Sequence, residues 1–226
     1  MSIIAIILWL FVLLLAITVH EAAHAWTALK KGDPTAYNLG RVTLNPLAHI
    51  DPLGTVLIPI ILVVVGAPPF GWAKPVPVNP YNLRYPRQDN LWISAAGPMA
   101  NLTLGFLALL VIVILKFLFP SLNTFLHDFF LSGRALPRGF YPLQGLVVIL
   151  FYLTLTNIYL AIFNLIPVPP LDGSGILMGI LSYEAALRYD RLRPFGIFIV
   201  LTLVYLGVLQ LIIRPIENLI YTIVFL

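Results

Sequence analysis

A pair of histidines one helical turn apart inside a long apolar segment constrains the fold of this chain most. Residues 2–29 are apolar apart from Ser2, two threonines and the motif His-Glu-Ala-Ala-His at residues 20–24. This segment is long enough for a membrane-spanning helix. Because an α-helix turns once per ~3.6 residues, His20 and His24 project from one face, where they can bind a metal ion together. Glu21 lies beside them and can transfer protons. The alternatives are a polar contact between helices or a chance match to a short pattern.

The composition of the chain indicates a membrane protein with several spans. Of 226 residues, 60% are hydrophobic and only 10% are charged, whereas ordinary soluble domains carry about 25% charged residues. Apolar segments recur along the whole length, so residues 1–226 are expected to form a single domain. The net charge of +4 is spread over short loops, which points to membrane topology and away from a nucleic-acid partner. The absence of cysteine excludes disulfides and thiolate chemistry.

The order of apolar and polar segments predicts an all-α polytopic membrane protein. We expect about five to six transmembrane or re-entrant helices, with a small extended or β segment near residues 70–80. The N-terminal helix should end at Lys30 and Lys31, because Gly32 and then Asp33-Pro34 follow. The expected spans are residues 2–29, 91–119, 143–166 and 195–226, with a short helix at residues 174–187.

Residues 53–65 are apolar but short for a complete span, and Pro59 lies among them. The segment can either cross the membrane at a tilt or enter and return to the same side. If it returns, nine of the thirteen Lys and Arg residues fall on the side that holds Lys30 and Lys31. The positive-inside rule therefore favours the re-entrant arrangement, with that side in the cytoplasm.

The segment at residues 66–90 is rich in proline and glycine. In an extended conformation, Pro75 and Pro77 lack N–H groups on one edge, whereas Lys74, Val76 and Val78 offer theirs on the other. Such an edge can receive a peptide substrate. A rigid loop of polyproline type is the equally weighted alternative.

A carboxylate is expected at the same depth as the two histidines. His20 precedes Lys30 by ten residues, and therefore lies roughly 15 Å below the charged end of its helix. The proline-rich break at residues 167–173 follows a span that enters from the opposite side, so Asp172 can meet the two imidazoles. Two histidines and one carboxylate with an open position are typical of catalytic zinc. Asp172 could instead only cap the next helix.

These motifs resemble the site-2 protease family of intramembrane metalloproteases. The resemblance rests on residues 20–24 and on Asn164 to Gly173, with supporting similarity at residues 97–101 and 72–80. It implies a zinc endopeptidase that cleaves transmembrane segments of other proteins in the lipid bilayer, with one Zn²⁺ per chain. The resemblance makes His20, His24 and Asp172 the zinc ligands, with Glu21 and Asn164 as catalytic residues. Trp72, Lys74 and Val76 are the candidate substrate-binding residues.

Two other functions are compatible with the same residues. Intramembrane His and Asp can line the path of a divalent-metal transporter, and a non-catalytic member could act as a scaffold that binds membrane helices. His49 and Asp51 could form a second metal site or orient a ligand, but capping of the next segment is the favoured interpretation, since a His beside Asp and Pro is more often structural. The chain contains neither a PDZ insertion nor a CBS domain, and it resembles a minimal member of the family. Its small size suits a multi-pass protein of a prokaryotic plasma membrane, with the active site towards the cytoplasm; its oligomeric state stays open.

Overall fold

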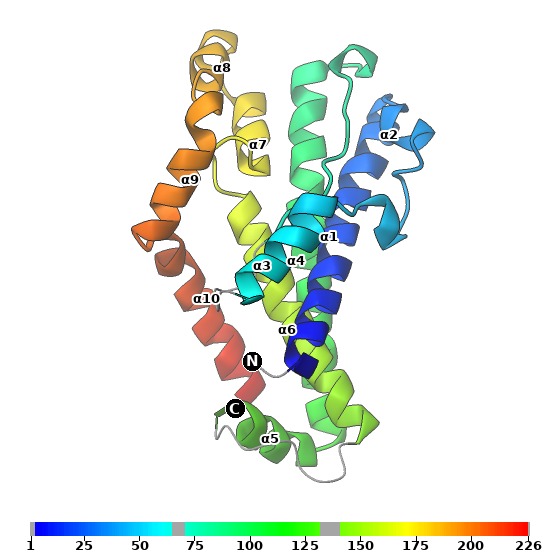
Figure 1. Ribbon diagram of the computed structural model, residues 1–226, viewed down its shortest axis with the longest axis vertical. Helices are drawn as coiled ribbons and strands as arrows, with labels where there is room; N and C mark the ends of the chain where they lie inside the picture. Colours follow the sequence, from blue (N-terminus) through cyan, green and yellow to red (C-terminus); the bar gives the residue numbers. More distant parts are fainter. Residues whose placement is uncertain (1–2, 65–70, 132–140, 226) are drawn as a thin grey trace.

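The computed structural model describes residues 3–64, 71–131 and 141–225, and these ranges contain helices but no β-strand (Figure 1). Four helices in them are long and apolar enough to cross a membrane. The protein is therefore an all-α membrane protein, as the sequence predicts. The four helices are α1 (Ile3–Lys31), α4 (Pro86–Leu118), α6 (Pro142–Asn164) and α10 (Val208–Phe225).

Shorter elements connect these helices, and two of them, η2 and η4, have π-helical geometry. The connecting elements are α2 (Thr35–Asn38), η1 (Pro46–Ala48), η2 (Pro52–Leu57), α3 (Ile58–Val64), η3 (Pro80–Asn82), α5 (Ser121–Leu126), η4 (His127–Leu131), α7 (Asp172–Ile180), α8 (Tyr183–Asp190), η5 (Arg193–Phe195) and α9 (Gly196–Tyr205).

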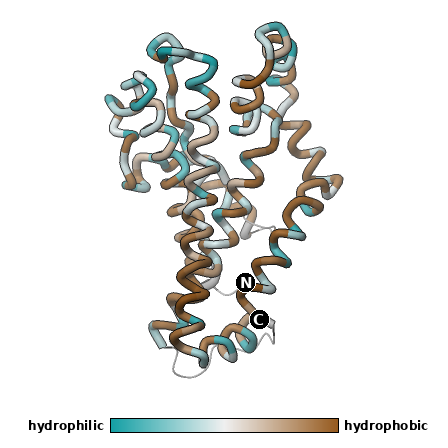
Figure 2. The backbone as a smooth tube through the Cα atoms, turned by 180° about the vertical axis from the view of Figure 1, so that it is seen from behind, coloured by the Kyte–Doolittle hydropathy of each residue, from teal (hydrophilic) through white to brown (hydrophobic). Residues whose placement is uncertain are grey.

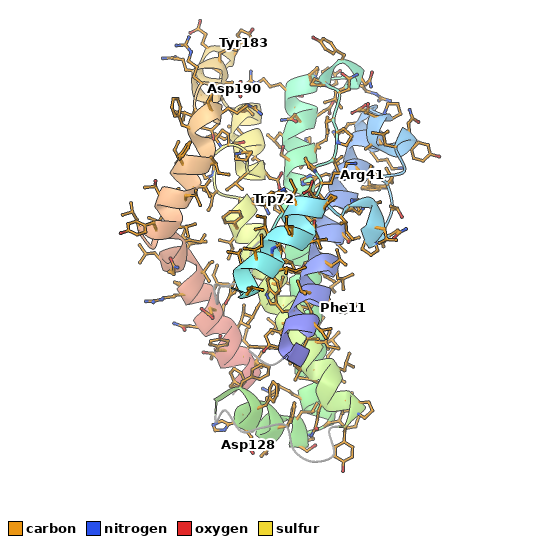
Figure 3. All side chains as sticks on the ribbon, in the orientation of Figure 1. Phe11, Arg41, Trp72, Asp128, Tyr183 and Asp190 are labelled. Atoms are coloured by element: carbon orange, nitrogen blue, oxygen red, sulfur yellow. The ribbon has the colours of Figure 1, made fainter. Side chains whose placement is uncertain are left out.

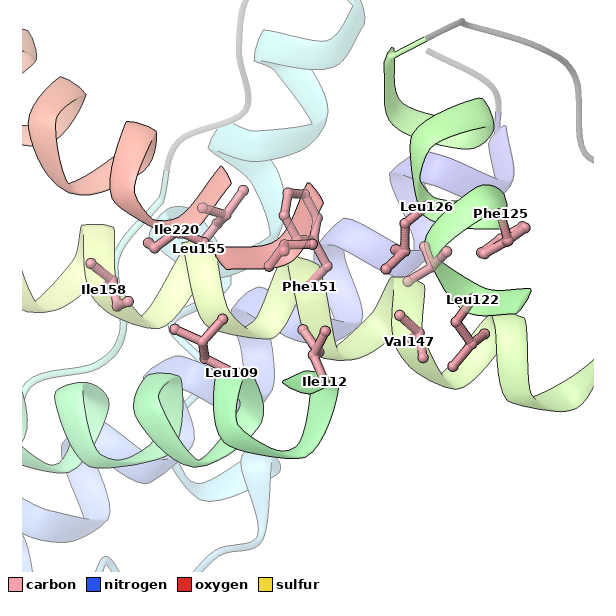
Figure 4. Close-up of a cluster of buried hydrophobic side chains, with 12 residues drawn as sticks. Leu109, Ile112, Leu122, Phe125, Leu126, Val147, Phe151, Leu155, Ile158 and Ile220 are labelled. Carbon is pink, nitrogen blue, oxygen red and sulfur yellow. The ribbon is translucent and has the colours of Figure 1, made fainter. Parts of the chain in front are cut away.

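Helices α1, α4 and α6 form the inner part of the molecule, with α4 packed against both of the others and against α7. Leu109 and Ile112 of α4 meet Phe151 and Leu155 of α6 in a buried apolar cluster, to which α10 adds Ile220 (Figure 4). Their side chains are 0–9% exposed. Because α4 packs against α6 in this cluster and also against α1, these contacts fix the position of the residues that α1 and α6 carry into the interior.

The end of α1 is where the sequence predicts it. Gly32 has a φ of 108°, in the left-handed region that stops a helix at little cost. The buried carboxylate of Asp33 follows and accepts hydrogen bonds from Thr35 N, Asn79 N and Asn82 Nδ2 at 3.0, 2.7 and 2.8 Å. This one side chain thus joins the end of α1 to the residues that precede α4.

Two predicted helices are broken in the structure. Residues 195–226 do not form one span, because Gly207 adopts a φ of 72° and separates α9 from α10. Residues 174–187 are likewise divided into α7 and α8, since Leu181 and Ser182 are extended and the Ser182 hydroxyl caps α8. In Figure 1, α9 and α10 diverge from the inner helices at an angle to them.

The segment predicted to be re-entrant forms η2 and α3, which lie across the inner helices at mid-height (Figure 1). It is not among the four helices long enough to span. Its last residue, Val65, and residues 66–70 of the following segment lie outside the described ranges. Residues 71–79 have no regular secondary structure, so the small β segment expected near residues 70–80 is absent from its described part.

Hydropathy divides the molecule along its long axis. Apolar residues cover the long helices, and hydrophilic residues gather at the end that holds α2, α8 and the start of α4 (Figure 2). Tyr183 and Asp190 lie at this end, whereas Asp128 lies at the other (Figure 3). This distribution is that of a chain whose middle faces lipid.

Candidate metal centre

His20 and His24 lie side by side on α1 and are buried, with 6% and 8% of their surface exposed. Their ring centroids are 4.6 Å apart and the rings are nearly perpendicular. Both Nε2 atoms approach one carboxylate oxygen, Asp172 Oδ2, at 3.0 Å from His20 and 3.4 Å from His24. The structure therefore brings together the three residues that the sequence proposes as metal ligands.

Asp172 reaches the histidines because the chain between α6 and α7 is irregular. Residues 165–171 form turns, and α7 begins at Asp172 itself. The alternative role of Asp172 as a helix cap is not observed, since Leu171 occupies the N-cap position and no side chain caps the helix. Asp172 Oδ2 is buried without a hydrogen-bond partner. Its geometry fits a ligand and does not fit a cap.

One face of α4 holds both imidazoles from behind. Ile93, Gly97 and Asn101 are spaced four residues apart and so lie on successive turns. The Ile93 carbonyl accepts a hydrogen bond from His24 Nδ1 at 2.7 Å, and Asn101 Oδ1 lies 2.5 Å from His20 Nδ1. Gly97 leaves room for the rings, because a Cβ atom there would lie 2.6 Å from His20 Nε2 and closer still to His24.

These contacts define which ring nitrogens face the aspartate. If Nδ1 of each imidazole donates to its oxygen acceptor, each neutral ring presents the lone pair of Nε2. Two nitrogen lone pairs then face a carboxylate oxygen, and all three ligand atoms lie within 4.8 Å of one another. Such a cluster needs a cation between the atoms. The donor set fits zinc, which binds imidazole nitrogen and carboxylate oxygen in three-ligand catalytic sites.

Glu21 lies next to the histidines and borders a cavity of about 450 Å³. Its Oε2 accepts a hydrogen bond of 3.1 Å from the backbone N–H of Val76. The cavity extends from α1 to α6 and α9 and is mostly apolar. It is lined by Ile17, His20, Glu21, Gly71, Trp72, Ala73, Leu160, Phe163, Asn164, Pro170, Leu171, Ile197, Val200 and Leu201.

Backbone N–H groups of residues 71–79 donate hydrogen bonds to other segments of the protein, and these bonds hold residues 71–79 in place. Trp72 N donates to Gly54 O at 3.2 Å, Lys74 N donates to His49 O at 3.0 Å, and Arg41 donates to the Lys74 carbonyl. In this structure the N–H groups of Lys74 and Val76 are engaged within the protein, by His49 O and Glu21 Oε2. The role of these two residues in substrate binding stays a prediction. Trp72 is the one of the three predicted substrate-binding residues that lines the cavity, and it lies at mid-height beside η2 (Figure 3).

Asn164 also lines the cavity, at the last turn of α6. Its Nδ2 donates to the Leu160 carbonyl of its own helix at 2.9 Å. Asn164 thus lines the same cavity as Glu21 and Leu171, with its amide nitrogen engaged by its own helix.

His49 and Asp51 do not join a metal cluster among the described residues, where His20, His24 and Asp172 form the group of three possible ligands. His49 is buried and its Nε2 lies 2.9 Å from the Thr43 carbonyl. Asp51 caps η2 by accepting hydrogen bonds from Leu53 N and Gly54 N at 3.0 and 2.6 Å. The structural alternative for this pair is the one observed.

The fold and the site together define a helical membrane protein with a two-histidine, one-carboxylate centre beside a glutamate. The model of peptidase family M50 matches residues 8–206. The chain belongs to this family of metalloproteases, and the family implies zinc.

Curated relatives with the name "Putative zinc metalloprotease" match most of the chain. YwhC of Bacillus subtilis is 35% identical over 201 residues, which cover 86% of this chain and 80% of the relative. Rip2 of Mycolicibacterium smegmatis is 30% identical over 84% of this chain and 63% of its own length, and Rip2 of Mycobacterium tuberculosis H37Rv is 27% identical over the same shares. No solved structure gives a significant match.

Proposed function

We propose that this metalloprotease hydrolyses peptide bonds in or near transmembrane segments of other proteins, within one domain that spans residues 1–226. The observation that carries the proposal is the convergence of His20, His24 and Asp172 between helices that are apolar enough to lie in a bilayer. Ionisable residues at that depth are costly and mark functional sites.

One zinc ion per chain would be held by His20 Nε2, His24 Nε2 and an oxygen of Asp172. The bound ion supplies Lewis acidity, which polarises a substrate carbonyl and makes water more acidic. The buried positions of His20 and His24 and the half-buried position of Asp172 support this assignment, because burial excludes competing water and packing fixes the ligands.

Glu21 is the proposed general base and acid. Its Oε2 is engaged by the Val76 N–H, so Oε1 is the oxygen that takes the proton from the attacking water. The same carboxyl group then returns that proton to the nitrogen of the leaving amine. A carboxylate fixed at one oxygen keeps the other aimed into the cavity.

The mostly apolar cavity is the proposed site of the substrate. Its walls come from α1, α6 and α9 and from Trp72, which suits an apolar segment. Asn164 in the same wall is proposed to help hold the oxyanion of the tetrahedral intermediate. Lys74 and Val76 would act on the substrate indirectly, by holding residues 71–79 in place. A helical substrate must unwind before its peptide bond can enter.

The proposed location is a plasma membrane, with the centre nearer the cytoplasmic side. The hydrophilic end of the molecule contains Lys30, Lys31 and the basic turn at residues 188–193. An excess of Lys and Arg marks the cytoplasmic side of a membrane protein.

A cleavage assay with purified protein in lipid vesicles tests the proposal. The substrates are one transmembrane segment with Gly and Pro near its centre and one of poly-Leu. We expect cleavage of the first and little of the second. Glu21→Gln should retain its zinc and lose roughly 10²- to 10⁴-fold in rate, whereas the control Glu184→Gln on the exposed face of α8 should match the wild type.

Two results would contradict the proposal. Metal flux across the vesicles without cleavage would favour the transporter, and bound zinc with neither activity would favour the scaffold. Equal cleavage of the two substrates would contradict the requirement for unwinding.

A further inference from the structure

Two asparagines connect the ring of His20 to helices α4 and α6. Asn101 Oδ1 lies 2.5 Å from His20 Nδ1, and Asn101 Nδ2 lies 2.7 Å from Asn157 Oδ1. Both asparagine side chains are 0% exposed. The mechanism proposed above uses neither of them, yet three helices meet at this chain of polar groups in the interior of a membrane protein.

The orientation of both amides follows from their backbone partners. The oxygen and nitrogen of an amide side chain are otherwise difficult to tell apart. Here Asn101 Nδ2 donates to the Ala16 carbonyl at 3.0 Å, and Asn157 Nδ2 donates to the Leu153 carbonyl at 2.8 Å. Because carbonyl groups only accept hydrogen bonds, the nitrogens must face them. Asn101 Oδ1 is therefore the atom that faces His20.

An amide oxygen facing His20 Nδ1 selects one form of the ring. Nδ1 must carry the hydrogen, and Nε2 then presents its lone pair towards Asp172 Oδ2, 3.0 Å away. His24 reaches the same form without an amide, because its Nδ1 donates to the Ile93 carbonyl.

We infer that Asn101 and Asn157 are positioning residues that fix the tautomer and orientation of His20 and so prepare it to bind metal. The inference rests on the proposed metal centre. Asn157 Oδ1 holds the Asn101 amide together with the Ala16 carbonyl, because both accept from Asn101 Nδ2, and Asn157 also ties α6 to α4 seven residues before Asn164. Outer partners of this kind typically change metal affinity by roughly 10- to 100-fold when they are removed.

The first experiment measures the tautomer of both rings in metal-free protein labelled with ¹⁵N-histidine, by two-bond ¹⁵N–¹H correlation spectra. In the wild type we expect Nδ1 of both His20 and His24 to carry a hydrogen (the Nδ1–H form), whether or not Nε2 also carries one while no metal is bound. Asn101→Leu should lose this form at His20 and keep it at His24, which serves as the internal reference. Thr154→Val is the matched control, because Thr154 is buried in α6 and bonds only to the Leu150 carbonyl of its own helix.

The second experiment measures zinc affinity by competition with a chromophoric chelator. Asn101→Leu should bind zinc roughly 10- to 100-fold more weakly, whereas Asn101→Asp should stay near the wild type, because either form of the carboxyl group accepts from His20 Nδ1. A purely structural role predicts the same loss in both variants, since both remove the amide N–H groups that donate to the Ala16 carbonyl and to Asn157 Oδ1.

Equal loss of affinity in the two Asn101 variants would overturn the inference, and so would a wild-type tautomer and affinity in Asn101→Leu. If Asn101→Leu does not fold, Asn157→Leu decides. Among the hydrogen bonds of the described residues, the Asn157 side chain bonds to Asn101 and to the Leu153 carbonyl and not to the ring. We expect this change to weaken the Nδ1–H form of His20; an unchanged ring and affinity would overturn the inference. The tautomer is measured without zinc or substrate, so absence of cleavage would contradict the proposed function and leave this result standing.

Discussion

The metal centre joins two regions of the molecule that are built differently. His20 and His24 project from the middle of α1, and both of their Nδ1 atoms are engaged by α4. Asp172 follows an irregular connection, and its side chain is 20% exposed, compared with 7% and 10% for the two imidazoles. The helices thus fix the two proposed histidine ligands, whereas the proposed third ligand and Glu21, the proposed general base, depend on loops.

The same contrast holds for the helices around the cavity. In the most apolar 18-residue stretch of α6, 50% is buried inside the molecule, compared with 11% of the corresponding stretch of α10. Helix α9, which supplies Ile197, Val200 and Leu201 to the cavity, lies on the same loosely packed side as α10. If a transmembrane substrate entered the cavity, as proposed, a path past α9 would disturb the inner helices least.

The largest effect on zinc affinity is expected from a change in the part of the site that helices α1 and α4 hold. Gly97→Ala places a methyl group against both rings, and zinc affinity should fall by more than about 100-fold, beyond the usual effect of an outer-sphere change. Metal analysis after gel filtration measures this. Gly105→Ala is the control for crowding of α4 alone, since its Cβ would meet Ile158 Cγ1, Thr154 O and Asn157 Cβ at 3.0, 3.3 and 3.4 Å, and neither imidazole is among these nearest atoms. Full zinc occupancy in Gly97→Ala would contradict the close approach of α4.

A smaller effect on zinc affinity is expected from a change of Asp172, the proposed ligand that follows an irregular connection. Asp172→Asn keeps an oxygen at the site and removes its charge, so zinc affinity should fall by about tenfold, or roughly 1.4 kcal/mol. The two histidines should continue to hold the metal. Chelator competition gives the ratio of the zinc affinities of Asp172→Asn and wild type. A larger loss of affinity in Asp172→Asn than in Gly97→Ala would contradict the expectation that the helix-held part of the site matters more than the loop-held part.

A third change separates proton transfer from metal binding. Val76→Pro removes the N–H that donates to Glu21 Oε2, and the cleavage rate should fall about tenfold, a part of the usual contribution of a general base. Zinc content should be unchanged. Val78→Pro is the control, because no acceptor for the Val78 N–H is found in the described ranges. An equal loss of rate in both variants would indicate disruption of residues 71–79 as a whole.

Of these changes, a substitution of Asp33 is expected to affect zinc affinity least, and to act on stability instead. Burial alone would raise the pKa of this carboxyl, but hydrogen bonds from Asn82, Thr35 and Asn79 outweigh it and lower the pKa below the ordinary 3.8. A depressed pKa stabilises the folded state above pH 3.8, and this contribution is lost as the pH falls through the folded pKa. Asp33→Asn should lower the free energy of unfolding by about 1.5–3 kcal/mol at neutral pH.

Thermal unfolding in detergent at several pH values checks this prediction. The difference between wild type and Asp33→Asn should shrink as the pH falls below 3.8, while zinc affinity at neutral pH stays the same. A difference in stability that does not depend on pH would contradict the role given to the ionised carboxylate.

The sequence predicts the parts of the site that depend on spacing within one helix. His20 and His24 share a face because of their separation alone, and Asp172 was expected at their depth because a proline-rich break lies in a span. Asn157 was not identified, and Asn101 was noted only within residues 97–101 without a role, because the role of both depends on how α4 and α6 are rotated against α1. The spacing of Ile93, Gly97 and Asn101 by four residues was the available signal.

The errors in the predicted fold have similar causes. The break at Gly207 lies in a continuous apolar run, where hydropathy is the same for one helix or two. Proline positions show which N–H groups are missing from residues 71–79, but they do not show where the remaining ones point. The donors of Lys74 and Val76 are directed to His49 and Glu21 by the packing of distant segments.

Zinc K-edge X-ray absorption of the purified protein in lipid nanodiscs tests whether His20, His24 and Asp172 bind zinc. We expect one zinc per chain, with two imidazole nitrogens at about 2.0–2.1 Å and oxygen ligands at about 2.0–2.2 Å. His20→Ala should remove one imidazole from this shell. Protein without zinc, or a zinc shell that lacks imidazole and is unchanged in His20→Ala, would contradict the account.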